Sequence, residues 1–190
     1  MKIAGHGQAK ILSPDEIERL FQDGLVGNRD RALFGLCLYT ASRIAEACSM
    51  PSMDVYDQAG EVVSKILLRK GNTKGKISTR SMRTHPRLVD LLMAYRPTAG
   101  KLYLFPGRWG RGHIHPKAAH KLLRTACLRV GLVGVSTHSF RRTALTTMAS
   151  AGVPLRVIQE ISGHRSLSAL QRYLEVTEQQ VSAAIETLIF

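Results

Sequence analysis

The sequence is poor in acidic residues and cysteine, and it has no long apolar run. It holds 14 Asp and Glu residues against 27 Lys and Arg residues, a formal net charge of +13. Its three cysteines, Cys37, Cys48 and Cys127, are scattered through apolar sequence, so we expect buried thiols rather than disulfides or a thiolate metal site. No run is long enough to cross a membrane, and the N-terminus lacks the hydrophobic block of a signal peptide. We therefore expect a cytoplasmic protein without membrane contact.

The few acids lie almost entirely toward the two ends of the chain. From Val62 to Gln159 there are nineteen Lys or Arg residues and a single acid, Asp90. Such a polycationic middle suits a phosphate backbone, because neutralising phosphates releases condensed counterions. The composition therefore predicts contact with nucleic acid, the alternative being a basic protein that is merely soluble or ribosome-associated.

The 190 residues are enough for one domain with a sizeable core. Residues 1–11 read as a flexible tail, after which Ser13-Pro14-Asp15-Glu16 has the cap, proline and glutamate of a helix start. Apolar periodicity predicts further helices over residues 29–39, 86–95 and 116–131, and a terminal helix over residues 177–190. Between the first two of these, β-type runs over residues 62–68 and 77–82 flank a glycine-containing turn, which predicts a hairpin with a lysine-rich tip.

The helix predicted over residues 116–131 carries a basic stripe. Lys117, Lys121 and Arg124 are spaced at i, i+4 and i+7, and apolar residues occupy the opposite side. Such a helix can rest on a core and offer cations to a DNA groove, although a solvated basic face is the alternative.

Three histidines, His113, His115 and His120, lie at the start of this helix. Two histidines two residues apart can share a metal ion, but no Asp, Glu or Cys lies between Asp90 and Cys127 to complete a site. Pro116 marks a helix start, so we expect these histidines to cap the helix and face phosphate, with no metal bound.

The stretch from Thr137 to Tyr173 gathers four polar groups that can bind or attack a phosphate. His138 and Arg141, three residues apart, share a face of a helix capped by Ser136 or Thr137. A second helix begins at Pro154 and stops near Gly163, which places His164 at its end. Tyr173 follows nine residues later, after a short link.

His138-x-x-Arg141, Gly163-His164 and Tyr173 resemble the C-terminal signature of the tyrosine recombinases, the phage-integrase family. Upstream, the segment from Thr40 to Glu46 resembles the family's first arginine motif, with Ala41 where a glycine is usual. The resemblance covers roughly residues 12–180. It implies a mainly α-helical fold with a small antiparallel β-sheet. We expect one catalytic domain (residues 1–190) without a separate N-terminal core-binding domain, for which these residues leave no room; the sequence is then either a fragment of a longer protein or a short single-domain recombinase.

The resemblance also implies roles for the matched residues. Arg43 and Arg141 would neutralise a phosphodiester, His138 and His164 would donate hydrogen bonds or move a proton, and Tyr173 would be the nucleophile. Lys74 is the best match to the family's catalytic lysine, and Lys70 and Lys76 remain alternatives. The reaction implied is site-specific DNA recombination through a covalent 3′-phosphotyrosine, without ATP, metal or other cofactor.

Two of these residues also have structural interpretations. Arg43 can be a helix-surface arginine paired with Glu46 or Asp54, and Tyr173 can pack its ring on Leu170 or Val176. At two other positions the sequence departs from many relatives: Arg142 replaces a histidine, and Ser162 replaces a leucine.

The expected partner is double-stranded DNA. A homotetramer is expected on DNA and a monomer or weak oligomer in its absence, with a nucleoid-associated location and the helix over residues 177–190 docked on a neighbouring subunit. A non-catalytic helix-turn-helix regulator is the alternative, because helices joined at residues 151–154 imitate that motif. It leaves Arg43 and the His164 to Tyr173 spacing unexplained. The residues expected to contact DNA are Lys70, Lys76, Arg80, Lys117, Lys121, Arg124 and Arg142.

Overall fold

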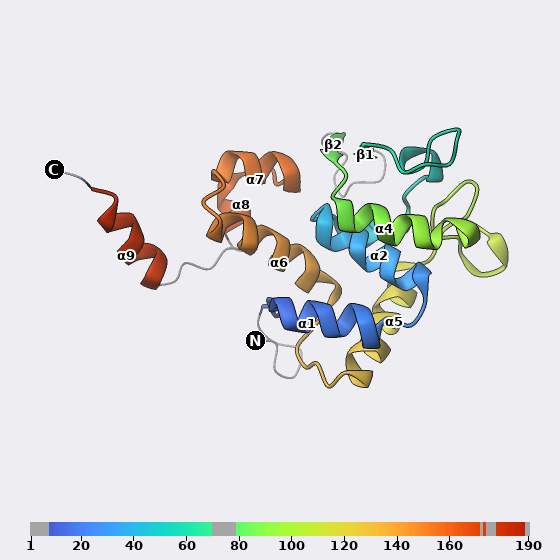
Figure 1. Cartoon of the computed structure of the whole chain (residues 1–190), viewed down its shortest axis with the longest axis horizontal. Helices are drawn as coiled ribbons and strands as arrows, with labels where there is room; N and C mark the ends of the chain where they lie inside the picture. The colour runs from blue at the N-terminus through green and yellow to red at the C-terminus, as the bar shows by residue number, and fades with distance from the viewer. Residues whose placement is uncertain (1–7, 70–78, 172, 174–177, 189–190) are drawn as a thin grey trace.

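The computed structural model describes residues 8–69, 79–171, 173 and 178–188, and Figure 1 shows how their elements are arranged. These residues are mainly α-helical, with one small antiparallel sheet, which confirms the predicted fold class. The helices are α1 (Pro14–Arg19), α2 (Asn28–Tyr39), α3 (Ile44–Cys48), α4 (Pro86–Tyr95), α5 (Pro116–Arg129), α6 (Thr137–Ser150), α7 (Leu155–Ser162), α8 (Leu167–Gln171) and α9 (Glu178–Glu186).

Several helices start where the sequence supplies a cap. At α1 the Ser13 hydroxyl accepts from the Glu16 amide, and the Glu16 carboxylate accepts from the Ser13 amide. At α4 and α5 a histidine takes the capping position ahead of a proline. The Nδ1 atoms of His85 and His115 accept from backbone amides at 3.2 and 3.1 Å. The predicted capping role of His115 is therefore confirmed.

The sheet pairs β1 (Lys65–Leu68) with β2 (Arg80–Arg83), with Ile66 opposite Met82. Strand β1 is shorter than its predicted range of 62–68, and β2 ends one residue beyond its predicted range of 77–82. Val62 leaves the ladder because it forms an isolated bridge with Tyr56, and β2 runs on to Arg83. The lysine-rich tip, with Lys70, Lys74 and Lys76, lies outside the described residues.

The main core surrounds α2, which is buried on nearly all sides as its apolar sequence predicts. This helix contacts α4, α6 and α3, and the ring of Phe34 stacks on Phe140 of α6 with centroids 5.2 Å apart. All three cysteines are free and buried. Burial raises the pKa of Cys127 to about 11 and that of Cys48 to about 12.

A second, smaller hydrophobic core attaches the C-terminal helices to the rest of the domain. It is built from Ala41, Leu145, Ile158 and Leu170, and the Tyr173 ring packs against it. The cluster joins α6, α7 and α8 to the loop that follows α2. The loop after α2 and the C-terminal helices are thereby held beside one another.

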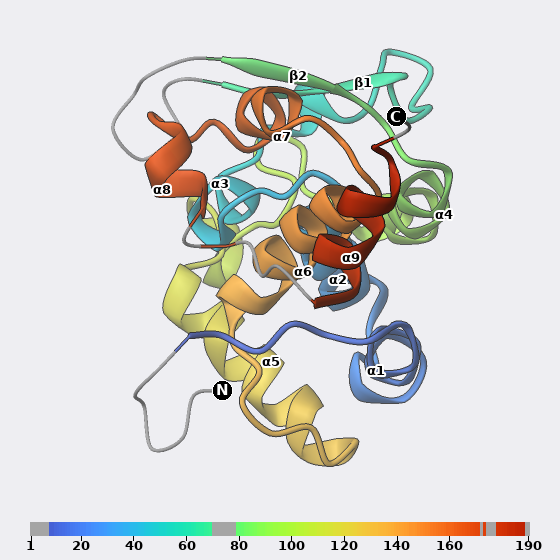
Figure 2. The ribbon, with the colours of Figure 1, turned by 90° about the vertical axis from the view of Figure 1, so that its left-hand side faces the viewer.

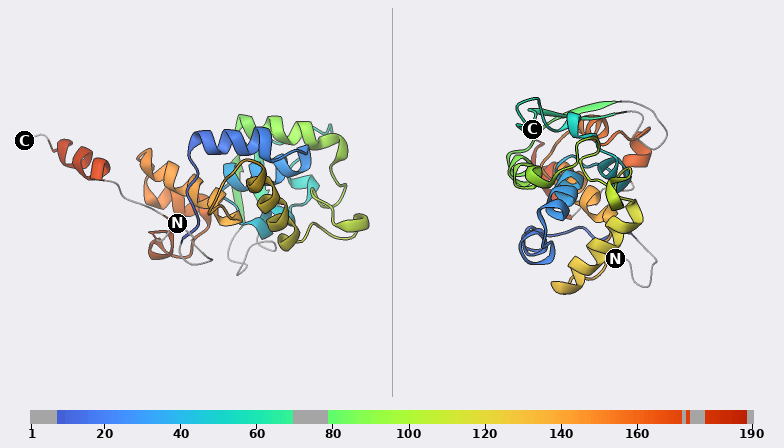
Figure 3. Two further views of the ribbon diagram at one scale, coloured as in Figure 1. Left: turned by 90° about the horizontal axis from the view of Figure 1, so that it is seen from below. Right: turned by 90° about the vertical axis from the view of Figure 1, so that its right-hand side faces the viewer.

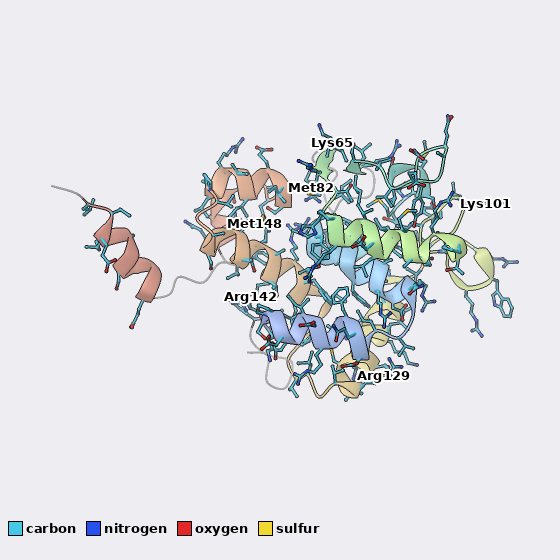
Figure 4. The ribbon with its side chains drawn as sticks, viewed as in Figure 1. Lys65, Met82, Lys101, Arg129, Arg142 and Met148 are labelled. Atoms are coloured by element: carbon cyan, nitrogen blue, oxygen red, sulfur yellow. The ribbon has the colours of Figure 1, made fainter. Side chains whose placement is uncertain are left out.

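The segment ahead of α1 is tied to α6. The Leu12 amide donates to the Thr143 hydroxyl at 2.9 Å, and the Arg142 guanidinium donates to the Ala9 carbonyl oxygen. Figure 4 labels Arg142 at the part of α6 that passes this segment. The flexible tail predicted for residues 1–11 therefore needs correction: residues 9–12 are anchored, and residues 1–7 lie outside the described part.

Helix α9 stands apart from the body of the domain in Figure 1 and in the left-hand view of Figure 3. It forms inside the predicted range of 177–190. The side chains of Val181, Ile185 and Leu188 on this segment are exposed. Among the described residues, no helix combines the length and apolarity needed to cross a membrane.

Candidate active site

Arg141 occupies the centre of the site. Only 1% of its surface is exposed, although it is one of the largest polar side chains. Its Nη1 donates to the Ala41 carbonyl, and its Nη2 donates to the Ser162 carbonyl at 2.8 Å. One guanidinium thus joins α6 to the loop after α2 and to the end of α7. His138, one turn earlier on α6, is exposed, so the two residues of the predicted motif differ in burial.

Ala41 holds an unusual backbone conformation next to this arginine. Its φ is 47°, in the left-handed region that favours glycine, although its side chain is an alanine methyl group. The turn requires positive φ, which accounts for the glycine that the resemblance leads us to expect at this position. The alanine methyl packs in the second core, and the turn presents its carbonyl to Arg141.

Glu46 links two arginines from different parts of the chain. It is 1% exposed, and its Oε1 accepts from Arg43 at 3.0 Å while its Oε2 accepts from Arg80 at 2.8 Å. Oε2 also accepts from the Arg43 backbone amide at the start of α3. Arg43 is therefore oriented by Glu46. Asp54, the other possible partner, instead accepts from Nε and Nη2 of Arg69.

Arg80 lies inside the protein, which differs from its predicted contact with DNA. It is 7% exposed, and besides Glu46 it donates to the Ile161 carbonyl at 2.6 Å. A Cβ atom on Gly163 would come within 2.9 Å of Arg80 Cδ, so glycine at this helix end also makes room for the arginine. Burial lowers the pKa of Arg80, and Glu46 opposes that shift.

Arg142 differs from its prediction in the same way. It is 6% exposed and donates to Ala9 rather than facing outward. The physical reason is that consecutive helical residues point in different directions, and α6 is covered on both sides. Arg141 reaches the loop and α7, whereas Arg142 reaches the N-terminal segment.

His164 and Tyr173 complete the cluster. His164 follows Gly163, which ends α7 with a left-handed φ of 63°, and its ring centroid lies 5.0 Å from that of Tyr173. The His164 Nε2 atom is 3.2 Å from Arg141 Nη2, and the Arg141 Cζ atom lies 6.0 Å from the Tyr173 ring centroid. Tyr173 also packs in the same core cluster as Leu170. The structural packing predicted for this tyrosine therefore does not exclude its position beside His164.

The electrostatics of the cluster favour an anion. Burial, together with the neighbouring Arg43 cation, lowers the pKa of Arg141 to about 9, while Glu46 and Tyr173 act in the opposite direction. The residue nevertheless stays protonated at neutral pH. Within the described residues, Arg141 Nε is buried and has no hydrogen-bond acceptor. A phosphate oxygen can satisfy a buried, partly unpaired guanidinium of this kind.

Helix α5, which contacts α3, carries the predicted basic stripe. Lys117, Lys121 and Arg124 are all exposed, while Ala119 and Leu123 on the opposite side are buried. The predicted two-sided character of this helix is confirmed. Figure 2 shows α3, α8 and the first turns of α5 along the same side of the domain. A pocket of about 700 Å³ adjoins α5 and includes Lys121, Arg111 and Arg129 in its lining.

The sequence reasoning missed the supporting residues of the site. The sequence predicts Glu46 only as a possible partner of Arg43, a pairing that the structure confirms, and it gives Ser162 no role in the reaction. The structure adds Glu46, Arg80 and Ser162 as direct neighbours of the predicted arginines and histidine. Among the described residues there is no group of three or more potential metal ligands.

Residues 10–180 match the Phage integrase family, and the chain belongs to that family. It is 28% identical over 183 residues to a tyrosine recombinase of Pseudothermotoga lettingae, covering 94% of this chain and 60% of that protein. It is 30% identical over 170 residues to the tyrosine recombinase XerC of Myxococcus xanthus, covering 86% and 55% respectively. The chain thus spans less than two thirds of the length of these relatives.

Solved structures show the same fold. The crystal structure of XerA recombinase matches with a TM-score of 0.78 at 22% identity, covering 97% of this chain and 68% of that one. XerH recombinase, bound to palindromic difH substrate in a post-cleavage complex, matches with a TM-score of 0.75 at 20% identity, covering 93% and 52%.

Proposed function

We propose that this chain is the catalytic domain of a tyrosine-type site-specific recombinase, which cuts and rejoins double-stranded DNA through a covalent 3′-phosphotyrosine. The observation that carries the proposal is that His164 and Tyr173 both lie beside the buried guanidinium of Arg141. Arg43 is close enough to affect the pKa of Arg141. Family membership adds support. A helix-turn-helix regulator would need none of these contacts.

The chemistry follows from the charges. A phosphodiester repels nucleophiles, so its non-bridging oxygens must be neutralised as negative charge grows on them in the transition state. Arg43 and Arg141 supply forked donors for those oxygens. The Tyr173 oxygen attacks phosphorus, a new P–O bond forms, and the bond to the 5′ oxygen breaks. The energy of the phosphodiester stays in the tyrosine ester, so rejoining requires neither ATP nor a metal.

Two proton transfers accompany these bond changes. Tyr173 loses its phenolic proton, and the leaving 5′ oxygen gains one. We assign the second transfer to the hairpin lysine, Lys74 or one of its alternatives Lys70 and Lys76, which lie outside the described residues. His138 and His164 provide hydrogen bonds or proton movement on the phosphate side.

DNA binding and assembly complete the proposal. The stripe of Lys117, Lys121 and Arg124 would contact the duplex, and the location would be the nucleoid. The exposed apolar side chains of α9 and the residues after it would dock on a neighbouring subunit, giving a homotetramer on DNA. XerH, which shares this fold, was solved in complex with its difH substrate, and that complex supports DNA as the partner here.

The chemistry can be tested without knowing the target site. The protein is mixed with a labelled pool of nicked random-sequence duplexes and quenched in detergent, and a covalent protein–DNA band is sought. The nick lets the short 5′ fragment leave, which traps the phosphotyrosine. We expect a band for the wild type, none for Tyr173→Phe, and a band at least a hundredfold weaker for Arg141→Ala, given losses of several kcal/mol for removed oxyanion donors.

Tyr103→Phe is the matched control, because it removes a hydroxyl from a tyrosine elsewhere in the domain. It should give the wild-type band. DNA retention without any covalent band, even at high protein concentration, would instead favour the regulator.

Assembly has its own test. Ile185→Glu places a charge on the exposed apolar side of α9. The DNA complex should then hold one protomer at each bound site instead of four protomers in all, and its mass should fall accordingly. Mass photometry on a duplex containing the trapped sequence measures this, with Ser182→Glu as the control on the same helix. Equal masses for both variants and the wild type would remove α9 from the assembly.

A further inference from the structure

Among the described residues, His164 has a hydrogen-bonding neighbour at each ring nitrogen. On one side, its Nε2 atom lies 3.2 Å from Arg141 Nη2. On the other side, its Nδ1 atom lies 2.7 Å from the Ser162 hydroxyl oxygen. That oxygen also lies 3.2 Å from the Gln159 carbonyl oxygen. The ring and both neighbours are buried, so water competes little for these contacts.

The direction of each hydrogen bond can be worked out from the groups at the two ends. A guanidinium nitrogen only donates, so His164 Nε2 must be the acceptor and carries no proton. A carbonyl oxygen only accepts, so the Ser162 hydroxyl proton points to Gln159. The hydroxyl oxygen is then left to accept from His164 Nδ1, which must carry the ring proton. Every donor in this chain of three hydrogen bonds finds an acceptor.

We propose that Ser162 is a positioning residue that holds His164 in the tautomer protonated on Nδ1, with the Nε2 lone pair directed toward Arg141. The backbone is fixed by the same turn, because the Gln159 side-chain amide donates to the His164 carbonyl at 3.0 Å. A leucine at this position would have no oxygen to accept the Nδ1 proton. The device therefore depends on the serine of this chain.

The consequence for the reaction rests on the proposed function. When the Tyr173 oxygen attacks phosphorus, its proton must pass to a base. When Arg141 Nη2 donates to a phosphate oxygen instead of to His164, Nε2 can take up that proton, and the resulting imidazolium still donates from Nδ1 to Ser162. The other tautomer has no lone pair on Nε2 and would direct an N–H toward the Arg141 guanidinium, another donor. Ser162 thus acts through His164 and does not itself touch the reacting atoms.

The tautomer can be measured directly on the wild-type protein without DNA. Two-dimensional NMR of protein labelled with ¹⁵N-histidine distinguishes a protonated ring nitrogen from a bare one, and the spectrum of His164→Gln identifies the signals. We expect a protonated Nδ1 and a bare Nε2 for neutral His164. A protonated Nε2 overturns the proposal. Because no cleavage is involved, this result is independent of whether the protein is a recombinase.

A variant then tests the role of the hydroxyl. Ser162→Ala should abolish the preference for protonated Nδ1 and slow formation of the covalent DNA complex roughly tenfold, the effect typical of losing one orienting hydrogen bond. DNA affinity should not change. Ser168→Ala, at an exposed serine of α8, is the matched control and should leave the tautomer and the rate unaltered.

Retention of both the wild-type tautomer and the wild-type rate in Ser162→Ala would overturn the proposal. A thermal melt shows whether each variant is folded. If Ser162→Ala does not fold, the spectrum of the wild-type protein decides the question alone.

Discussion

The arginines around Glu46 and the cations of α5 have the same charge but opposite surroundings. Arg80 and Arg141 are buried and donate to carboxylate or carbonyl oxygens of the protein. Lys117, Lys121 and Arg124 are exposed, and none is paired with an acid in the part of the chain that the structure describes. Charge count alone therefore does not define a DNA-binding surface. The buried cations hold the site in shape, and the exposed ones are free to meet phosphates.

The strongest test of this contrast is to remove the buried carboxylate. Glu46→Ala leaves Arg80 buried without its anion, and we expect a loss of about 3–5 kcal/mol in the free energy of unfolding. Urea denaturation measures it. Glu160→Ala is the control, since that glutamate pairs with Arg156 on the exposed side of α7 and should cost less than about 1 kcal/mol. Equal losses of unfolding free energy in the two variants would show that the buried and the exposed ion pairs contribute alike.

Arg80→Met should have the next largest effect. The methionine retains apolar bulk but loses the bonds to Glu46 and Ile161, so we expect a loss of about 2 kcal/mol in stability. Covalent complex formation should slow as well, while DNA affinity stays within twofold of the wild type. Fluorescence anisotropy with a labelled duplex checks the affinity. A large fall in affinity without destabilisation would restore the sequence-based prediction that Arg80 contacts DNA.

Loss of exposed cations should show the reverse pattern. In the double variant Lys121→Ala and Arg124→Ala, we expect weaker DNA binding and a slope of log affinity against log salt that is smaller by about 2. The unfolding free energy should change by less than about 0.5 kcal/mol. Lys101→Ala, at an exposed lysine labelled in Figure 4, is the control. An unchanged slope in the double variant would exclude the stripe from the interface.

The smallest effect is expected at Ala41. Replacement by glycine relieves a left-handed conformation that costs about 1–2 kcal/mol. It also removes a buried methyl group worth about 0.8 kcal/mol and adds freedom to the unfolded chain worth about 0.5–1 kcal/mol. These contributions nearly cancel, so the unfolding free energy of Ala41→Gly should lie within about 1 kcal/mol of the wild type. A loss above about 2 kcal/mol would mean that the methyl packing dominates.

Local signals in the sequence were sufficient for much of the fold. Ser13 with Glu16, His85 with Pro86, and Gly163 mark helix ends because caps and left-handed turns depend on neighbouring residues. The apolar periodicity of α2 and α5 likewise reflects burial on one or all sides. These features require no knowledge of distant parts of the chain.

The partners of the charged side chains could not be predicted in this way. Arg142 is fixed by Ala9, and Arg80 by Glu46 and Ile161, all remote in sequence. One signal was available for Arg80. Arg80 and Met82 are two residues apart on β2, and side chains two apart in a strand share a face. The arginine therefore lies on the same face of the strand as a partly buried methionine.

The anchoring of residues 9–12 on α6 also has a mechanical meaning. Tension applied to the chain at Ala9 would act on residues that are hydrogen-bonded to α6. It would reach Arg142 and Thr143 directly, on the same helix as Arg141 and immediately after it. Residues 9–12 are therefore mechanically coupled to the helix that carries the central guanidinium.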